Sequence, residues 1–124
     1  MSKTHSQKFV DLVNEALSRV AEISCDDVNK ALNQSSTFVL IDTREVHEFI
    51  NGHLPGAIHL SKGVIERDIE EHVSDTDTEL ILYCGGGYRS VLAGDNLQKM
   101  GYSNVKSMAG GWREWIENEY ETEL

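Results

Sequence analysis

The chain has 124 residues, of which 40% are hydrophobic and 26% charged, and its formal net charge is -10 at pH 7. This length fits one domain with its own core, and the acidity argues against nucleic acid or an anionic membrane surface as a partner, because both attract basic patches. The two cysteines, Cys25 and Cys84, form no paired-cysteine motif, so we expect neither a disulfide framework nor a bound metal. Since the first residues lack the apolar segment of a signal peptide and no apolar run is long enough to span a membrane, we expect a cytoplasmic protein.

Hydrophobic periodicity predicts an amphipathic N-terminal helix within residues 1–21, ahead of a main domain over residues 22–124. We expect this helix to cover the core; the alternative is a dimerisation helix, so the chain is expected to be a monomer or a weak homodimer. Short apolar runs predict buried strands at 38–41, 57–60, 80–83 and 104–108, and helices are expected at 24–32, 45–50, 64–73, 91–100 and 112–118.

The alternation of strands and helices predicts an α/β fold, with a central, mostly parallel sheet covered by helices on both faces. Binding sites in such open sheets lie beyond the carboxyl ends of the strands. The segments expected to meet at that edge are Asp42, the residues after Leu60, Cys84 and the loop 108–111.

The most informative segment is Cys84-Gly85-Gly86-Gly87-Tyr88-Arg89-Ser90, which joins a predicted buried strand to a predicted helix. Glycines let the backbone curl tightly, and the free amides at a helix start can point at one centre and favour negative charge there. Arg89 adds fixed positive charge with bidentate donors, and Ser90 can cap the helix or bond the sulfur. We therefore interpret Cys84 as a nucleophile that is partly or wholly thiolate at neutral pH.

Cys25 is also expected in the first turn of a helix, where the helix dipole would favour a thiolate. However, it lacks both a glycine-rich turn and a neighbouring arginine. We interpret Cys25 as a small buried hydrophobic residue.

Four motifs together resemble the rhodanese domain family, over residues 22–118. Cys84-x-x-x-x-Arg89 resembles the family's active-site loop, and Asp42-Thr43-Arg44 resembles its Asp-x-Arg segment. The segment 52–59, which begins Gly-His-Leu-Pro-Gly-Ala, and the closing Gly110-Gly111-Trp112 resemble two further family motifs. The N-terminal helix lies outside the usual domain.

The resemblance implies a rhodanese-like fold and a sulfurtransferase that moves a sulfane sulfur from a donor such as thiosulfate to cyanide or a thiol, through a persulfide on Cys84. It implies no cofactor; the partners are a small sulfur-donor anion and a thiol or protein-cysteine acceptor. The backbone from Gly85 to Arg89 would bind the substrate, and Tyr88 either shapes the pocket mouth or packs on the helix. Supporting roles are expected for Asp42, Arg44 and Ser90, with Arg44 in a salt bridge to Asp42 or Glu48. The implied substrate-binding residues are Gly85, Gly86, Gly87, Tyr88 and Arg89.

Two other functions are compatible with a cysteine in this setting. A cysteine phosphatase also places a cysteine and an arginine around a loop at a helix start, but with five residues between them, whereas four separate Cys84 from Arg89. The shorter loop is expected to fit one sulfur atom better than a tetrahedral phosphate. The second alternative is a persulfide carrier or sulfide-sensing module that does not turn over by itself.

Overall fold

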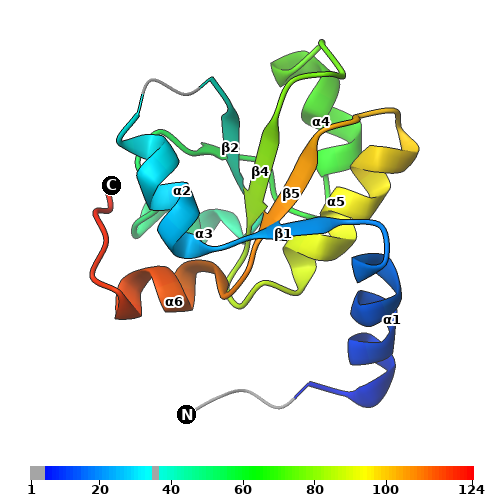
Figure 1. Ribbon diagram of the computed structural model, residues 1–124, viewed down its shortest axis with the longest axis horizontal. Helices are drawn as coiled ribbons and strands as arrows, with labels where there is room; N and C mark the ends of the chain where they lie inside the picture. The colour runs from blue at the N-terminus through cyan, green and yellow to red at the C-terminus, as the bar shows by residue number, and fades with distance from the viewer. Residues whose placement is uncertain (1–4, 35–36) are drawn as a thin grey trace.

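The computed structural model describes residues 5–34 and 37–124 of the chain (Figure 1). Five strands and six helices alternate along this part of the sequence. The strands are β1 (Ala21–Ile23), β2 (Val39–Asp42), β3 (Ile58–His59), β4 (Leu80–Tyr83) and β5 (Val105–Met108). The helices are α1 (Gln7–Leu17), α2 (Cys25–Leu32), α3 (Val46–Ile50), α4 (Ile65–His72), α5 (Arg89–Lys99) and α6 (Gly111–Glu117).

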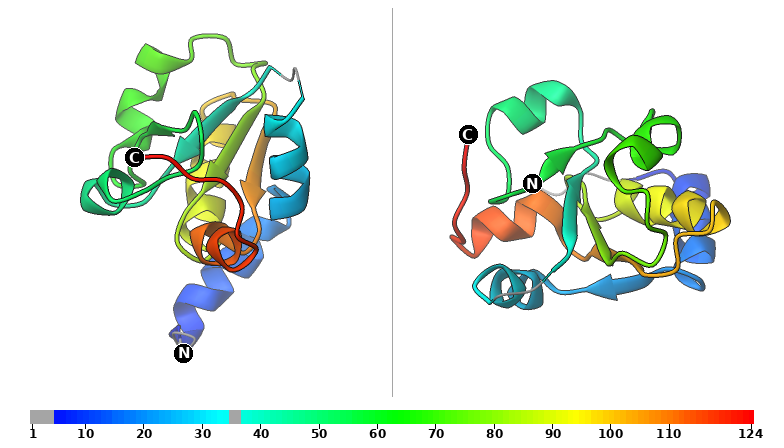
Figure 2. Two further views of the ribbon diagram at one scale, coloured as in Figure 1. Left: turned by 90° about the vertical axis from the view of Figure 1, so that its left-hand side faces the viewer. Right: turned by 90° about the horizontal axis from the view of Figure 1, so that it is seen from above.

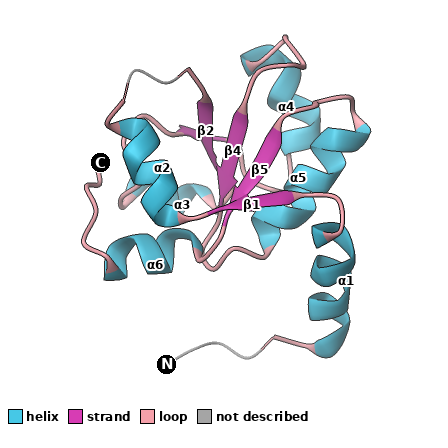
Figure 3. Ribbon diagram, in the orientation of Figure 1, coloured by secondary structure: helices cyan, strands magenta, loops and turns pink. Residues whose placement is uncertain are grey.

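The strands form one sheet in the order β1-β5-β4-β2-β3, and every pair of neighbours in it is parallel. The predicted α/β architecture with a parallel sheet is therefore confirmed. β4, which leads into Cys84, is the central strand, with β2 and β5 on either side. The carboxyl ends of these three strands lie at one edge of the sheet and bring distant loops together, as Figure 3 shows.

Both faces of the sheet are buried under helices (Figures 2 and 3). Leu80 and Leu82 of β4 pack with residues of α4 and α5 on one face, whereas Ile81 and Tyr83 pack with residues of α2 and α6 on the other. A strand sends successive side chains to opposite faces, so a strand buried on both sides must be a continuous apolar run. This is why the segment 80–83 was predictable as a strand.

One strand was not predicted. β1 has only three residues, lies at the sheet edge beside β5 and has two exposed positions, so it lacks the apolar run that marks a buried strand. β1 is held by its parallel pairing with β5, in which Ala21 lies opposite Lys106 and Ile23 opposite Met108. The boundary expected between residues 21 and 22 falls inside this strand.

The N-terminal helix packs against α5. Val13, Ala16 and Val20 form a buried cluster with Val91. Arg19, just after α1, donates two hydrogen bonds of 2.9 Å to the carboxylate of Asp95 on α5. Within the described ranges, no helix has the length and apolar character needed to cross a membrane.

Candidate active site

Cys84 is the first residue after β4, and its side chain is only 1% exposed, at the floor of a pocket. The backbone amides of Gly87 and Ser90 point at its Sγ atom, at 3.1 and 3.4 Å. The Ser90 hydroxyl lies 3.4 Å from the same sulfur and 2.7 Å from the Ser107 hydroxyl of β5. Donors that converge on sulfur favour its anionic form, since they offset the loss of water around a buried charge.

The loop is fixed from outside by the start of α6. Trp112 N–H donates to the Cys84 carbonyl at 2.8 Å, and Arg113 N–H donates to the Gly85 carbonyl at 3.0 Å. These bonds hold two loop carbonyls away from the sulfur. Gly111 permits the close approach: its φ is +58°, and a Cβ there would lie 2.5 Å from the Cys84 carbonyl oxygen.

Gly87 is the one loop glycine with a left-handed backbone, at φ +94°. A Cβ at this position would lie 3.0 Å from the backbone nitrogen of Gly110. Glycine therefore allows both the turn that aims the Gly87 amide at sulfur and the contact with the loop before α6.

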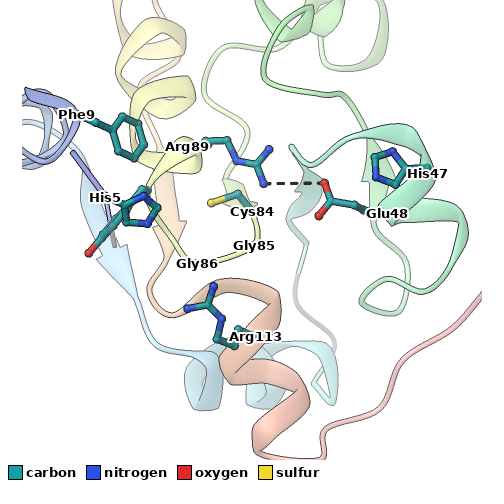
Figure 4. Close-up of a pocket in the computed structure, with 10 residues that line it drawn as sticks. His5, Phe9, His47, Glu48, Cys84, Gly85, Gly86, Arg89 and Arg113 are labelled. Carbon is teal, nitrogen blue, oxygen red and sulfur yellow. Dashed lines mark ion pairs between the residues drawn. The ribbon is translucent and has the colours of Figure 1, made fainter. Parts of the chain in front are cut away.

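The pocket above the loop has a volume of about 540 Å³. Figure 4 shows Cys84 between the N-terminal side chains His5 and Phe9 on one side and His47 and Glu48 of α3 on the other. Arg89 curls back over the loop, with its guanidinium 3.5 Å from the position of a Cβ on Gly85 and 4.0 Å from Glu48 Oε1. The lining residues are His5, Phe9, His47, Glu48, Cys84, Gly85, Gly86, Tyr88, Arg89 and Arg113.

The geometry brings the predicted loop residues together, but it places Asp42 and Arg44 beside the pocket rather than in its lining. Both are buried and form an ion pair of 2.7 Å. Arg44 also donates to the Gly52 carbonyl at 2.7 Å, and its guanidinium lies 4.4 Å from the Trp112 ring centre. The pair therefore ties the loop after β2 to the segment 52–59 and to α6.

Tyr83 connects this ion pair to the strand that carries the cysteine. Its hydroxyl donates to Asp42 Oδ2 at 2.8 Å and accepts from Leu54 N–H at 3.1 Å. Burial, together with the nearby Asp42 carboxylate, raises the pKa of Tyr83, so this phenol remains a hydrogen-bond donor. Burial opposes the charge on Arg44, but the hydrogen bonds and charge of Asp42 outweigh it and raise the pKa of Arg44.

Two histidines of the family-like segment serve as loop contacts. His53 Nδ1 lies 3.0 Å from the Phe49 carbonyl, and His59 Nε2 lies 2.7 Å from the Arg44 carbonyl. Neither ring lines the pocket. In the described part of the chain, no group of three or more histidine, cysteine or acidic side chains is arranged to hold a metal ion.

Cys25 lies away from this pocket and is fully buried. Its Sγ faces the carbonyl oxygens of Ala109 and Gly111, at 3.5 and 3.8 Å. Burial, with a further contribution from the Glu114 carboxylate, raises the pKa of Cys25 to about 12. This thiol is therefore protonated at neutral pH and unreactive.

Several residues of the site were not predicted from the sequence. Ser107 is the buried partner of Ser90, and its only signal was a hydroxyl residue in an apolar strand. Arg113 reaches the pocket because α6 begins against the loop, and a terminal nitrogen of its side chain lies 3.9 Å from the position of a Cβ on Gly86. His5 and Phe9 lie before and within α1, where sequence spacing gives no hint of proximity to Cys84.

Comparison with known proteins identifies the class to which this fold and site belong. The family model for the rhodanese-like domain matches residues 24–118. The chain therefore belongs to the rhodanese-like domain family.

Among individual relatives, a protein named "Putative thiosulfate sulfurtransferase, mitochondrial" from Schizosaccharomyces pombe is 34% identical over 113 residues, which covers 77% of this chain and 80% of the relative. A protein named "Putative sulfur carrier protein YrkF" from Bacillus subtilis is 28% identical over 102 residues. That match covers 82% of this chain but only 54% of the relative, so the chain corresponds to about half of that protein.

One solved structure is similar along almost the whole chain. It is a protein of unknown function from Rhodopseudomonas palustris, described as a possible tyrosine phosphatase, with 26% identity and a TM-score of 0.87. The superposition covers 99% of both chains, so the shared fold extends to the N-terminal helix, beyond the 24–118 range of the family model.

Proposed function

We propose that the chain is a sulfurtransferase that accepts a sulfane sulfur from a donor such as thiosulfate onto Cys84 and passes it to cyanide or to a thiol. The observation that carries this proposal is the convergence of the Gly87 and Ser90 amides on the Cys84 sulfur at the floor of an open pocket. The family membership and the names of the two relatives agree with sulfur chemistry at this cysteine.

In the first half-reaction, the Cys84 thiolate attacks the outer sulfur of thiosulfate. A new sulfur–sulfur bond forms, the bond inside thiosulfate breaks, and sulfite leaves with the bonding electron pair. The product is a Cys84 persulfide whose terminal sulfur carries the negative charge. The amides that contact Cys84 Sγ are near enough to stabilise that charge with a small displacement, and no proton transfer is needed.

In the second half-reaction, the acceptor attacks the terminal sulfur, and the Cys84 thiolate is the leaving group. Cyanide becomes thiocyanate, and a thiolate becomes a persulfide. Both half-reactions use the same ionised sulfur, either as nucleophile or as leaving group. A cradle that stabilises the thiolate therefore assists both steps.

Arg89 and Arg113 supply the positive charge that a dianionic donor needs in an otherwise acidic protein. Their guanidinium groups reach the pocket from α5 and α6, on either side of the loop (Figure 4). Each can donate two hydrogen bonds to the oxygens of a sulfonate group. We assign Arg89 the closer role because its guanidinium lies over Gly85, next to Cys84.

The experiment that tests the proposal is intact-mass spectrometry after incubation with thiosulfate. We expect a mass gain of one sulfur atom, which cyanide removes with release of thiocyanate. Cys84→Ser should abolish the gain, and Cys25→Ser should retain it. A protein that gains sulfur in neither the parent nor the Cys25 variant, although both are folded, would refute the proposal.

The same preparations distinguish the two alternatives. Multiple turnovers with thiosulfate and cyanide are expected for an enzyme, whereas a carrier would release only the sulfur that it was loaded with. Hydrolysis of an aryl phosphate that disappears in Cys84→Ser would instead establish a phosphatase. We expect no such hydrolysis, because the loop between Cys84 and Arg89 is too short for a phosphate cradle.

A further inference from the structure

Part of the pocket wall comes from outside the matched family range. The family model begins at residue 24, yet His5 and Phe9 line the pocket together with Cys84. Figure 4 shows both rings beside the cysteine, on the side opposite Glu48 and His47. The N-terminal segment thus takes part in the site as well as in the core.

These two rings and Tyr88 form a continuous aromatic surface, which we call the aromatic wall (His5, Phe9 and Tyr88). The His5 and Tyr88 ring centres are 4.5 Å apart, in an edge-to-face arrangement. Phe9 lies 5.2 Å from His5 and 5.9 Å from Tyr88. Such spacings are those of aromatic pairs in stable contact.

The aromatic wall is anchored at both ends. Tyr88 belongs to the loop that carries Cys84 and precedes α5 directly. Phe9 is held by α1, whose buried Val13 and Ala16 pack with Val91 of α5, and by the ion pair from Arg19 to Asp95. The wall is therefore fixed to the same helix that follows the reactive loop.

The pocket combines two kinds of surface around one sulfur atom. Arg89 and Arg113 offer charged donors, whereas the aromatic wall offers flat rings, and Tyr88 is 38% exposed. Neither thiosulfate nor cyanide has an apolar or aromatic group that could pack against such rings. A sulfane donor with an aryl group attached to its anionic sulfonyl group would use both surfaces at once.

We propose that the aromatic wall determines donor specificity and selects organic sulfane donors with a flat, apolar group next to the anionic centre, of which an aryl thiosulfonate is the model. This inference rests on the proposed sulfur transfer at Cys84. The Cys84 thiolate attacks the terminal sulfur of R–SO₂–S⁻, the sulfur–sulfur bond of the donor breaks, and R–SO₂⁻ leaves with the electron pair. The charge is conserved, and neither an oxidant nor a proton donor is required.

The test compares two donors that differ only in R. Sulfur transfer to cyanide is measured with benzenethiosulfonate and with methanethiosulfonate, and the ratio of the two kcat/KM values is the readout. In Phe9→Ala we expect this aryl-to-methyl ratio to fall about 3- to 10-fold, because one aromatic contact is lost for only one donor. Leu12→Ala is the matched control: Leu12 lies on the same helix, is 55% exposed and does not line the pocket, so its ratio should equal that of the parent.

A second variant and a binding measurement keep the inference testable even if Phe9→Ala folds poorly. His5 precedes α1, so His5→Ala leaves the helix intact and should also lower the ratio. Benzenesulfinate should inhibit the parent more strongly than methanesulfinate, and this difference should shrink in both variants. If the enzyme uses both donors but the ratio is the same in parent, His5→Ala and Phe9→Ala, the inference is wrong while the proposed function stands. If thiosulfate loads Cys84 with sulfur but neither thiosulfonate does, the inference is also wrong while the proposed function stands; if thiosulfate fails as well, the proposed function itself fails.

Discussion

At the scale of single residues, the two cysteines have opposite surroundings. Backbone amides point at the Cys84 sulfur, whereas carbonyl oxygens face the Cys25 sulfur. The partial positive charge of an amide hydrogen stabilises a thiolate, and the partial negative charge of a carbonyl oxygen destabilises it. Both side chains are almost completely inaccessible to solvent, so the two cysteines differ most visibly in the backbone groups that face their sulfur atoms.

This contrast predicts selective alkylation of the native protein. Because the pKa of Cys25 is raised to about 12, its thiolate is scarce at mildly alkaline pH. Iodoacetamide at about pH 8 should modify Cys84 and leave Cys25 unmodified, as judged by peptide mass mapping. In denaturant both cysteines should react, and equal labelling in the folded protein would contradict the assignment.

The Arg89 side chain gives a second prediction at this scale. Arg89→Lys should lower kcat/KM with thiosulfate about tenfold or more, because a point charge cannot replace a bidentate pair of charged hydrogen bonds. Arg67→Lys is the control, since Arg67 is exposed on α4 and pairs with its neighbour Asp68. Kinetics with saturating cyanide would measure the effect. An unchanged kcat/KM in Arg89→Lys would show that Arg89 does not contribute to donor binding.

Individual residues also mark the limit of what the sequence alone could predict. Cys84, the glycines and Arg89 form one contiguous segment, so local spacing was enough to find them. Ser107, Arg113 and Phe9 reach the site from β5, α6 and α1, and their places depend on tertiary packing. No single-sequence pattern encodes such contacts.

At the scale of secondary-structure elements, the active-site loop and the start of α6 form one unit. The two hydrogen bonds from Trp112 and Arg113 occupy carbonyls of the loop, and Gly111 allows the two backbones to touch. The amides of Gly87 and Ser90 point at the Cys84 sulfur within this unit. Strands were predictable where they form a continuous apolar run, as in β4. β1 was not predicted, because its pairing with β5 compensates for its weak sequence signal.

Gly111→Ala tests whether α6 holds the loop in place. The substitution adds a side chain where φ is +58° and where a Cβ would overlap the Cys84 carbonyl. We expect a loss of about 1–3 kcal/mol in stability and at least a tenfold loss of sulfur transfer, since the carbonyl must move. Gly63→Ala is the control, because a Cβ there meets open space and its φ is not positive. Thermal unfolding and turnover, measured on both variants, would show whether activity falls further than stability alone explains.

At the scale of the whole molecule, the sheet order places β4, the strand that leads into Cys84, between β2 and β5. The N-terminal helix α1 packs against α5, the helix that follows the loop of Cys84. The overall α/β plan was predictable because strands and helices alternate along the sequence and the strands other than β1 lie within short apolar runs. The position of α1 was not predictable, because it depends on Arg19 meeting Asp95 and on the cluster around Val91.

The Arg19–Asp95 contact predicts a pH-dependent contribution to stability. The hydrogen bonds from Arg19 lower the pKa of Asp95 below its ordinary value of 3.8. The folded state therefore binds this proton less readily than the unfolded state, so the contact stabilises the fold above that value and is lost as the pH falls through the lowered pKa. Asp95→Asn should lower the melting temperature at about pH 7, and the difference from the parent should shrink as the pH falls below 3.8 and through the lowered pKa of Asp95. Arg19→Gln should behave in the same way, and a difference that stays constant with pH would argue against this ion pair.

The pairing of β1 with β5 has a consequence for how the protein is made. Among the strands that the structure describes, β1 is synthesised first and its partner β5 last, so β1 can pair only after β5 has left the ribosome, and residue 123 then bridges back to residue 53. Parallel pairings between such distant segments form slowly and late. A nascent chain that ends before α6 would already contain the reactive thiol, but it would lack the amides that restrain the carbonyls beside it. Competence for chemistry should thus arise only after α6 has been synthesised and has packed against the loop of Cys84.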